Sequence, residues 1–278
     1  MCILCEKFGD PEIGRGRWYL NPSNYGRQLY RRRRPGSAPG EFTRGYRGGS
    51  AVQEVPGGLR NEAPERVPEL VASWWANVDK ERPAQVITLE DAFEVAALCH
   101  PFASMMCECR LWSRAREERN PDEYSCGGLG VGMLKWERWP ERYKGGVNFM
   151  TLEEAKDWLT RWVMRGMVPI IMTYGAPYVG GLCLCDYPDC GMIRRRLDVG
   201  IGCLKGHEVA VVDYDRCNGC GVCVQRCQWG ALKFEVTTGQ AHIDQYRCFG
   251  CGVCAVGCPR DAITMKPRSE FPALAEVW

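Results

Sequence analysis

The feature that most constrains this chain is a cysteine motif that occurs twice near its carboxyl end. The spacing Cys-x2-Cys-x2-Cys-x3-Cys runs from Cys217 to Cys227 and again from Cys248 to Cys258, with Pro259 following. Three thiolates two residues apart surround one corner of an iron–sulfur cube, and the fourth points to a neighbouring cube. This predicts two [4Fe-4S] clusters, one held by Cys217, Cys220, Cys223 and Cys258, the other by Cys248, Cys251, Cys254 and Cys227.

Zinc and disulfides are the other uses of closely spaced cysteines. Zinc ribbons take separated C-x2-C pairs and have no need of a third Cys two residues on. Disulfides need an oxidising compartment, whereas the start of the chain shows neither the basic region nor the apolar stretch of a secretory signal. Glycines between the ligands let the backbone approach sulfide closely, which favours the clusters: Gly219, Gly221, Gly250 and Gly252.

Composition narrows the remaining classes of function. The 278 residues suffice for one large domain or two ordinary ones. The net charge of +2 gives no general case for nucleic acid or an anionic membrane as a partner. No apolar run approaches the ~20 residues of a membrane helix. Eighteen cysteines without a secretory signal predict a reducing cytoplasmic setting, and an anaerobic one by extension.

Residues 1–60 predict an extended Arg/Gly/aromatic arm rather than a packed domain. They carry eleven basic and five acidic residues, interleaved with aromatic side chains and without apolar periodicity. Arginine and aromatic residues are enriched at protein interfaces, so the arm is expected to lie over another subunit of a redox complex. A solvated lead-in is the alternative, and RNA binding is disfavoured beside the cluster motif. The pair Cys2 and Cys5 is a weak signal for additional ligands.

Helical signals dominate residues 61–205. Residues 64–75 predict a short helix, and Thr88 and Thr151 cap two amphipathic helices, the second through a capping box with Glu154. A short apolar strand is expected over 168–172. Each capped helix leads to a Cys-x-Cys pair, which suggests a weak internal duplication.

Eight cysteines in this region predict one or two further metal sites. They form two groups: Cys99, Cys107, Cys109 and Cys126, then Cys183, Cys185, Cys190 and Cys203. Each group can supply four ligands alone, or 107, 109 and 126 can pool with 183, 185 and 190 while the other two are merely buried. Free cysteine is often buried without metal, and zinc is an alternative occupant, but an iron–sulfur cluster is favoured. His207 is expected to be a turn residue.

The carboxyl-terminal part resembles a known family. Residues 206–266 resemble the bacterial two-cluster ferredoxin domain, with the eight motif cysteines on its ligand positions. The usual Cys-Pro that closes the first copy is replaced by Cys227-Gln228, followed by Trp229. Residues 88–230 more loosely resemble anaerobe multi-cluster proteins that place a C-x-C-Arg element, here ending at Arg110, ahead of such a domain. The resemblance implies electron carriage.

These observations predict an α+β protein in four parts. They are the arm (1–60), a helix-rich cysteine domain (61–205), a two-cluster ferredoxin domain (206–266) and a docking tail (267–278). No nucleotide, flavin or hydrolase motif is present. The expected function is a non-catalytic electron-transfer subunit of a larger cytoplasmic oxidoreductase. The alternative is an enzyme with a substrate-accessible cluster in the front cysteine domain.

Overall fold

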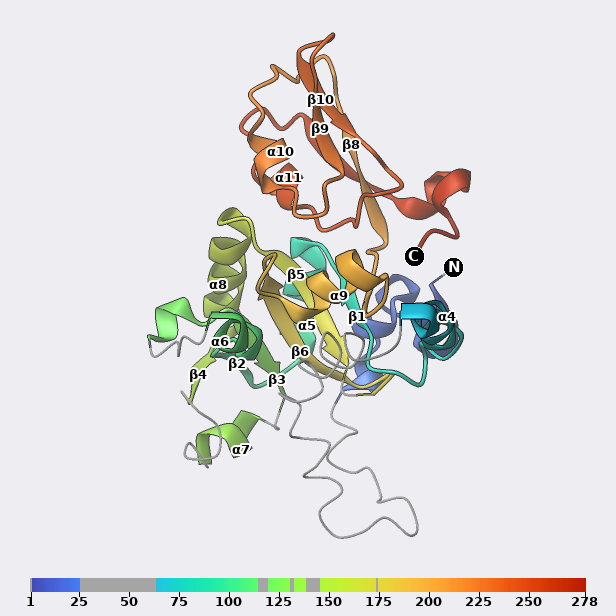
Figure 1. The fold of residues 1–278 in the computed structure, drawn as a ribbon. Helices are drawn as coiled ribbons and strands as arrows, with labels where there is room; N and C mark the ends of the chain where they lie inside the picture. Colours follow the sequence, from blue (N-terminus) through green and yellow to red (C-terminus); the bar gives the residue numbers. More distant parts are fainter. Residues whose placement is uncertain (1, 26–63, 115–119, 131–132, 139–145, 174) are drawn as a thin grey trace.

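The computed structural model describes residues 2–25, 64–114, 120–130, 133–138, 146–173 and 175–278. Helices and strands are mixed, as expected for the α+β class. A seven-stranded sheet with its helices forms the larger part, and a small cysteine-rich module stands on one end of it (Figure 1). We call these parts the sheet domain and, after the domain family that its cysteine motif resembles, the ferredoxin module.

The sheet has the strand order β4-β2-β3-β6-β5-β1-β7. Its neighbours pair antiparallel, except that the short edge strand β7 runs parallel to β1. The strands are β1 (Ala84–Val86), β2 (Phe102–Met105), β3 (Cys126–Leu129), β4 (Val147–Met150), β5 (Val168–Thr173), β6 (Val179–Cys185) and β7 (Cys203–Leu204). The helix-rich description of 61–205 was therefore incomplete, because this sheet organises the region.

The strand order reveals a duplication. The first six strands divide into two similar units, β1-α5-β2-β3, in which α6 is inserted between β2 and β3, and β4-α8-β5-β6. Each unit places its first strand beside the second strand of the other, and the two third strands meet in the centre, where Cys126 lies opposite Cys183. The internal repeat is thus a matter of topology. The two Cys-x-Cys pairs are not its equivalent positions, since one follows β2 and the other lies in β6.

Helices α5 (Leu89–Leu98) and α8 (Leu152–Met164) pack together over the sheet. The Thr88 side chain accepts a hydrogen bond from the Asp91 amide, and Thr151 forms the capping box with Glu154, so both predicted caps are confirmed. Trp158 of α8 packs against Phe102 at a ring distance of 5.7 Å. The remaining helices of this domain are α4 (Val67–Ala76), α6 (Glu108–Arg114), α7 (Met133–Arg138) and α9 (Gly191–Val199).

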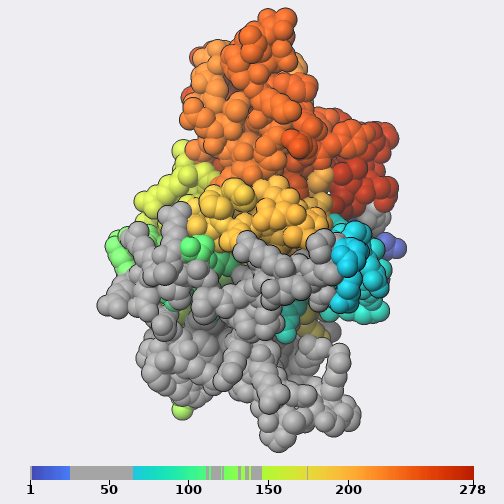
Figure 2. Space-filling view, viewed as in Figure 1, coloured from blue at the N-terminus to red at the C-terminus, as the bar shows by residue number. Residues whose placement is uncertain are grey.

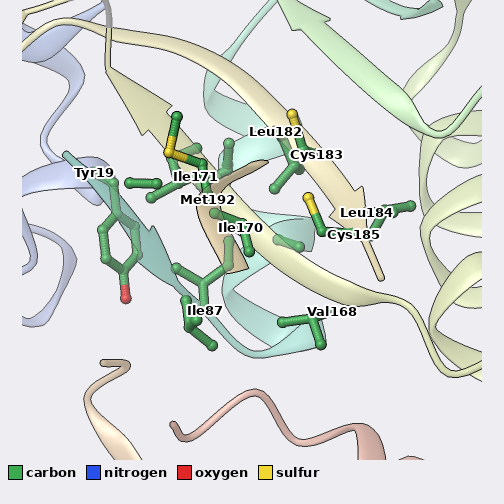
Figure 3. Packing of buried hydrophobic residues seen from close by; sticks show 14 of the residues in the cluster. Tyr19, Ile87, Val168, Ile170, Ile171, Leu182, Cys183, Leu184, Cys185 and Met192 are labelled. Atoms are coloured by element: carbon green, nitrogen blue, oxygen red, sulfur yellow. The ribbon is translucent and has the colours of Figure 1, made fainter. Parts of the chain in front are cut away.

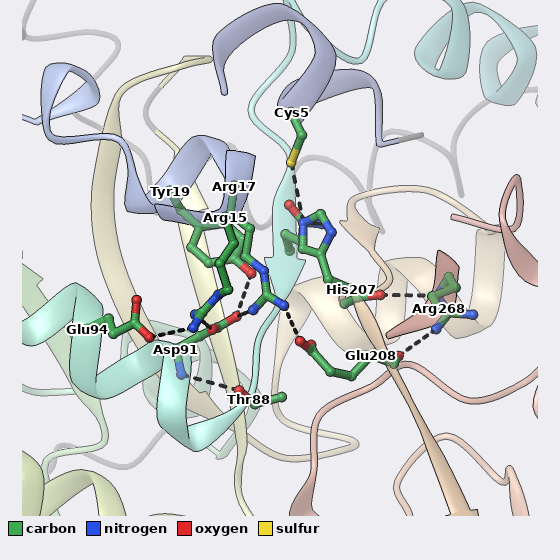
Figure 4. Close-up of polar contacts among 12 residues, drawn as sticks. Cys5, Arg15, Arg17, Tyr19, Thr88, Asp91, Glu94, His207, Glu208 and Arg268 are labelled. Carbon is green, nitrogen blue, oxygen red and sulfur yellow. Dashed lines mark hydrogen bonds and ion pairs between the residues drawn. The ribbon is translucent and has the colours of Figure 1, made fainter. Parts of the chain in front are cut away.

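The amino-terminal segment is folded, which corrects the prediction of an extended arm for residues 2–25. It begins with α1 (Ile3–Phe8) and continues in short 3-10 turns. Trp18 and Tyr19 are fully buried in the main core. Arg17 bridges Asp91 of α5 and Glu208 of the module (Figure 4). A few apolar side chains, too sparse for a periodic pattern, thus anchor the segment in the main core. Residues 26–60 of the predicted arm lie outside the described residues.

The ferredoxin module contains two antiparallel strand pairs and two short helices. Strand β8 (Glu208–Val212) pairs with β11 (Ile263–Pro267), and β9 (Leu232–Glu235) pairs with β10 (Gln240–Ile243). The helices are α10 (Val222–Arg226) and α11 (Val253–Val256). Gly221 and Gly252 cap them with φ of 74° and 72°, a left-handed conformation that side chains other than glycine rarely adopt.

The module is fixed to the sheet domain by specific contacts. Arg226 donates to the carbonyls of Val163 (2.8 Å) and Met164 (3.0 Å) at the carboxyl end of α8, where a cation is favoured. Gln228 donates to the Gly166 carbonyl at 2.7 Å. The rings of Trp229 and Phe249 stack at 3.7 Å and join the core of the sheet domain. Gln228, which replaces the usual proline, therefore serves docking.

The last residues also fold back on the protein. Leu274 is buried in the module core, and the Trp278 ring packs on His207 at 5.3 Å. Arg196 donates to the Trp278 carbonyl at 2.8 Å. Figure 2 shows this segment at the side of the projecting module. Within the described ranges, no helix combines the length and apolar character that a bilayer crossing requires.

We predict that Trp18→Ala strongly destabilises the protein. The change empties a fully buried site and removes the hydrogen bond from Trp18 Nε1 to Gln85, so the free energy of unfolding should fall by about 3–5 kcal/mol. Ile13→Ala, at a side chain that is 41% exposed on the same segment, should change it by less than about 0.5 kcal/mol. Urea unfolding followed by far-UV circular dichroism measures both. Equal effects would contradict the packed amino-terminal segment.

Candidate metal centres

The first candidate centre lies at the far end of the ferredoxin module. One small cavity is lined by the four thiols that the motif assigns to one cluster: Cys217, Cys220, Cys223 and Cys258. Its wall is completed by apolar side chains that include Val212 and Ile263. Three of these cysteines come from the loop before α10 and its first turn, and the fourth arrives from the end of the second copy.

The second candidate centre faces the sheet domain. Its cavity is lined by the other predicted set: Cys227, Cys248, Cys251 and Cys254. The stacked rings of Trp229 and Phe249 and the side chains of Leu232 and Ile243 enclose it. Thus the structure exchanges the fourth cysteine between the two copies in the way that the spacing predicts.

Backbone amides point at the sulfur atoms of both sets. The amides of Ala231 and Ala262 donate to Cys227 Sγ and Cys258 Sγ at 3.3 Å each. The Ala210 amide donates to Cys248 Sγ at 3.5 Å. Such donors stabilise thiolates, which are the form that binds metal. Burial raises the pKa of Cys251 to about 12, so a cation must compensate its thiolate. Donor type, number and surroundings fit two iron–sulfur cubes.

A third group of thiols gathers in the sheet domain. Each of its six members interacts with two others, and together they close a ring, which we call the six-thiol set. Its members, in order around the ring, are Cys107, Cys109, Cys190, Cys185, Cys183 and Cys126. This is the pooled arrangement that the sequence left open beside two separate sites.

The sheet explains how residues so far apart in sequence meet. Cys183 and Cys185 are alternate residues of β6, so both project from one face of the strand, as seen among the apolar side chains in Figure 3. Cys126 lies directly across from Cys183 on β3. Cys107 and Cys109 follow β2, the next strand, at the start of α6. Cys190 closes the ring from the amino-terminal end of α9.

Hydrogen bonds within the six-thiol set lower the pKa of two members. Cys126, then Cys185, donates to Cys183 and lowers its pKa to about 5, despite burial. Cys109 and then Cys185 do the same to Cys190, whose pKa falls to about 6. The pKa values of the donors Cys126 and Cys185 are raised above the usual range. Hydrogen bonds within the set therefore favour the thiolate form of these two members.

Arg110 and acidic residues hold the six-thiol set together. Arg110 donates to Asp186 at 2.9 Å and lies 3.7 Å from Asp189, so helix α6 is tied to the loop between Cys185 and Cys190. Burial, followed by the neighbouring Cys107 and Cys183, raises the pKa of Glu108. Arg110 of the C-x-C-Arg element therefore connects the part of the ring that contains Cys107 and Cys109 to the loop between Cys185 and Cys190.

Cys99 and Cys203 stand apart from the six-thiol set, so their assignment to a metal site stays a prediction. Cys99 ends α5, and burial raises its pKa to about 12. Cys203 lies on the edge strand β7, across β1, β5 and β6 from the ring, and burial likewise raises its pKa to about 12. Both thiols are buried, the ordinary fate of a free cysteine.

A hydrogen bond links the loop of the six-thiol set to the residue that follows Cys227 of the second centre. The Tyr187 amide, in the loop between Cys185 and Cys190, donates to Gln228 Oε1, and Gln228 directly follows Cys227. Sequence reasoning recorded this glutamine only as a departure from the family pattern. His207, expected as a turn residue, lies half-buried at a bend beside Cys2 and Cys5, and this grouping was not predicted. The Cys-x2-Cys spacing of Cys2 and Cys5 was the signal in the sequence that could have pointed to this group.

Comparison with known proteins agrees with the module geometry. A family model described as a 4Fe-4S dicluster domain matches residues 210–259. No curated protein matches the chain. The match indicates iron–sulfur clusters and electron transfer, and it covers the module rather than the sheet domain.

We predict that Cys220→Ser removes one cube. The variant loses a thiolate of the first centre and should contain about four fewer irons per chain, with a weakened second centre because both share one small core. Iron and acid-labile sulfide on anaerobically purified protein measure this. Unchanged iron would refute the ligand assignment.

The six-thiol set generates a separate prediction. Cys183→Ser should lower iron by about four per chain, while the module keeps its iron. Cys183 is the member of the ring that lies opposite Cys126 where β3 pairs with β6. Cys203→Ser is the matched control, another buried cysteine of the same domain that lies outside the ring. If both variants lose the same amount of iron, the effect comes from misfolding and the six-thiol set is not the site.

Proposed function

We propose that this chain is an electron-transfer subunit of a larger oxidoreductase, with three iron–sulfur centres in one row. Two are the centres of the ferredoxin module, and the third is held by the six-thiol set. The observation that carries the proposal is the hydrogen bond between Tyr187 and Gln228, which joins the two ligand loops. When bound, iron–sulfur clusters of this kind accept and release single electrons.

The spacing of the six thiols supports a cluster over a single zinc ion. Ligands of one tetrahedral ion crowd within a few ångströms of each other, whereas a cube holds its thiolates farther apart. Among the described residues, only Cys2, Cys5 and His207 bring three such ligand atoms within 4.8 Å of one another. No three thiols of the six-thiol set do so. The ring is wide, as are the two cysteine sets of the module.

Six thiols exceed the four that one cube takes. The ring contains three strand residues, Cys126, Cys183 and Cys185, and three cysteines at the starts of helices, Cys107, Cys109 and Cys190. The strand residues donate or accept hydrogen bonds with their ring neighbours. Those that do not ligate can donate S–H groups to sulfur and exclude water, since all six are buried or half-buried.

Electrons would leave or enter at the end of the module that holds the first centre, away from the sheet domain. Cys220 is exposed, unlike the other cysteines. Apolar side chains surround its loop: Tyr214 precedes Cys217, and Phe234 lies against Gly219. Phe234 and Tyr214 are about half exposed, and Val236 is 84% exposed. We propose this rim as the docking surface of a partner subunit. The cytoplasmic location and the anaerobic setting remain predictions from composition.

A reductive titration tests the proposal. Anaerobic wild-type protein should contain about twelve irons per chain and take up about three electrons, whereas Cys183→Ser should take up about two. Cys203→Ser should behave as wild type. Eight irons and two electrons in the wild type would confine electron transfer to the module. Reduction of an added small substrate by the isolated, pre-reduced protein would favour the enzyme alternative instead.

A further inference from the structure

A third kind of site lies where the amino terminus meets the ferredoxin module. Cys2 and Cys5 come from the first turn of the chain, and His207 from the segment that leads into β8. Their two Sγ atoms and a His207 ring nitrogen lie within 4.8 Å of one another, with Cys5 Sγ 3.3 Å from His207 Nε2 (Figure 4). We propose that these three residues bind one zinc ion, separate from the iron–sulfur centres.

The spacing of the ligands suits a single tetrahedral ion. Cys2 and Cys5 are joined by one helical turn, in which the Glu6 amide donates to the Cys2 carbonyl at 3.0 Å, so both thiols face the same side. With bonds of about 2.3 Å to sulfur and about 2.0 Å to nitrogen, neighbouring ligands of zinc lie roughly 3.5 Å apart. The sulfur–nitrogen distance already falls near this value. Two thiolates and an imidazole are also donors that zinc holds more tightly than iron(II).

The hydrogen-bond network supports Nε2 of His207 as the nitrogen that carries the lone pair. Trp18 Nε1 can only donate, and it donates to Gln85 Oε1 at 2.5 Å. Gln85 Nε2 must then be a donor, and it lies 3.0 Å from the Lys205 carbonyl and 3.4 Å from His207 Nε2. A ring nitrogen that faces the Gln85 amide and the Cys5 thiol is best satisfied as an acceptor, with the ring hydrogen on Nδ1. This is the tautomer that a metal ligand requires.

The surroundings hold the ligands in place. The His207 ring packs between Trp278 at 5.3 Å and Tyr19 at 5.9 Å. Gln85, which is fully buried, also lies 3.6 Å from Cys2 Sγ with its amide donor. Buried partners of this kind orient metal ligands and stabilise thiolates. Trp18 thus orients the Gln85 amide, and the Gln85 amide faces the proposed zinc ligands.

One coordination position is left for another ligand. Three protein ligands on a tetrahedral ion leave a position for water or an added donor, as in open zinc sites. A cavity of about 430 Å³ adjoins Cys2 and is lined by Glu6, Trp75, Glu276 and Trp278 among others. We assign the fourth position to a water molecule on this side. Zinc would also tie the amino-terminal segment to the module, because its ligands come from both.

Zinc content and zinc K-edge absorption of the full-length protein test the proposal, because iron does not obscure that edge. We expect about one zinc per chain, either as isolated or after adding one equivalent of Zn²⁺. Its shell should hold two sulfurs at about 2.3 Å and two nitrogen or oxygen atoms at about 2.0 Å. An all-sulfur shell would place zinc among the six thiols and overturn the assignment.

Variants separate this site from the iron–sulfur centres. Cys5→Ser and His207→Ala should each lower zinc occupancy at least tenfold in the presence of equimolar Zn²⁺, while iron and sulfide stay unchanged. Cys99→Ala, a buried cysteine away from the site, should keep its zinc and is the control. Full zinc in Cys5→Ser, or no zinc uptake by wild-type protein with normal iron, would overturn the proposal. So would a peptide mass showing a Cys2–Cys5 disulfide in anaerobically purified protein.

Discussion

The pairing of strands β3 and β6 is the constraint on which the proposed electron route depends. It joins the two halves of the duplicated sheet and sets Cys126 opposite Cys183. A shift of the register by one residue would turn Cys183 and Cys185 to the face that now carries Leu182 and Leu184. Glycine fits this seam, because a Cβ on Gly127 would lie 2.8 Å from the Leu182 carbonyl oxygen. The same register therefore turns the thiols of β6 toward the ring and its leucines toward the opposite face of the sheet.

Packing of the module against the sheet domain brings the loop of the six-thiol set into contact with the segment that follows Cys227. Arg226 and Gln228 bond to the end of α8 and the turn after it, and the stacked Trp229 and Phe249 fill the junction. The same glutamine accepts a hydrogen bond from the loop of the six-thiol set. A proline in its place, as in free two-cluster ferredoxins, has no side-chain amide to make these contacts. The departure from the family pattern thus lies at the contact between the module and the loop of the six-thiol set.

The ferredoxin module could be predicted from the sequence because its ligands are local and evenly spaced, and the helix caps at Thr88 and Thr151 because capping is local too. The seven-stranded sheet could not, since strands as short as β1 or β7 give little alternation to read, and their partners lie far away in sequence. For the same reason the pooling of Cys126 with Cys183 stayed one alternative among several. Residues 2–25 were misjudged because Trp18 and Tyr19 are buried by long-range packing, which no periodic pattern announces.

Anomalous diffraction from anaerobically grown crystals, recorded on both sides of the iron absorption edge, tests the central claim most directly. The account predicts three iron peaks in each chain. Two should lie inside the module, and the third should lie within the ring of six thiols, on the sheet-domain side of the contact between Tyr187 and Gln228. Iron confined to the module, with zinc or no metal among the six thiols, would contradict the account and leave the sheet domain a structural platform.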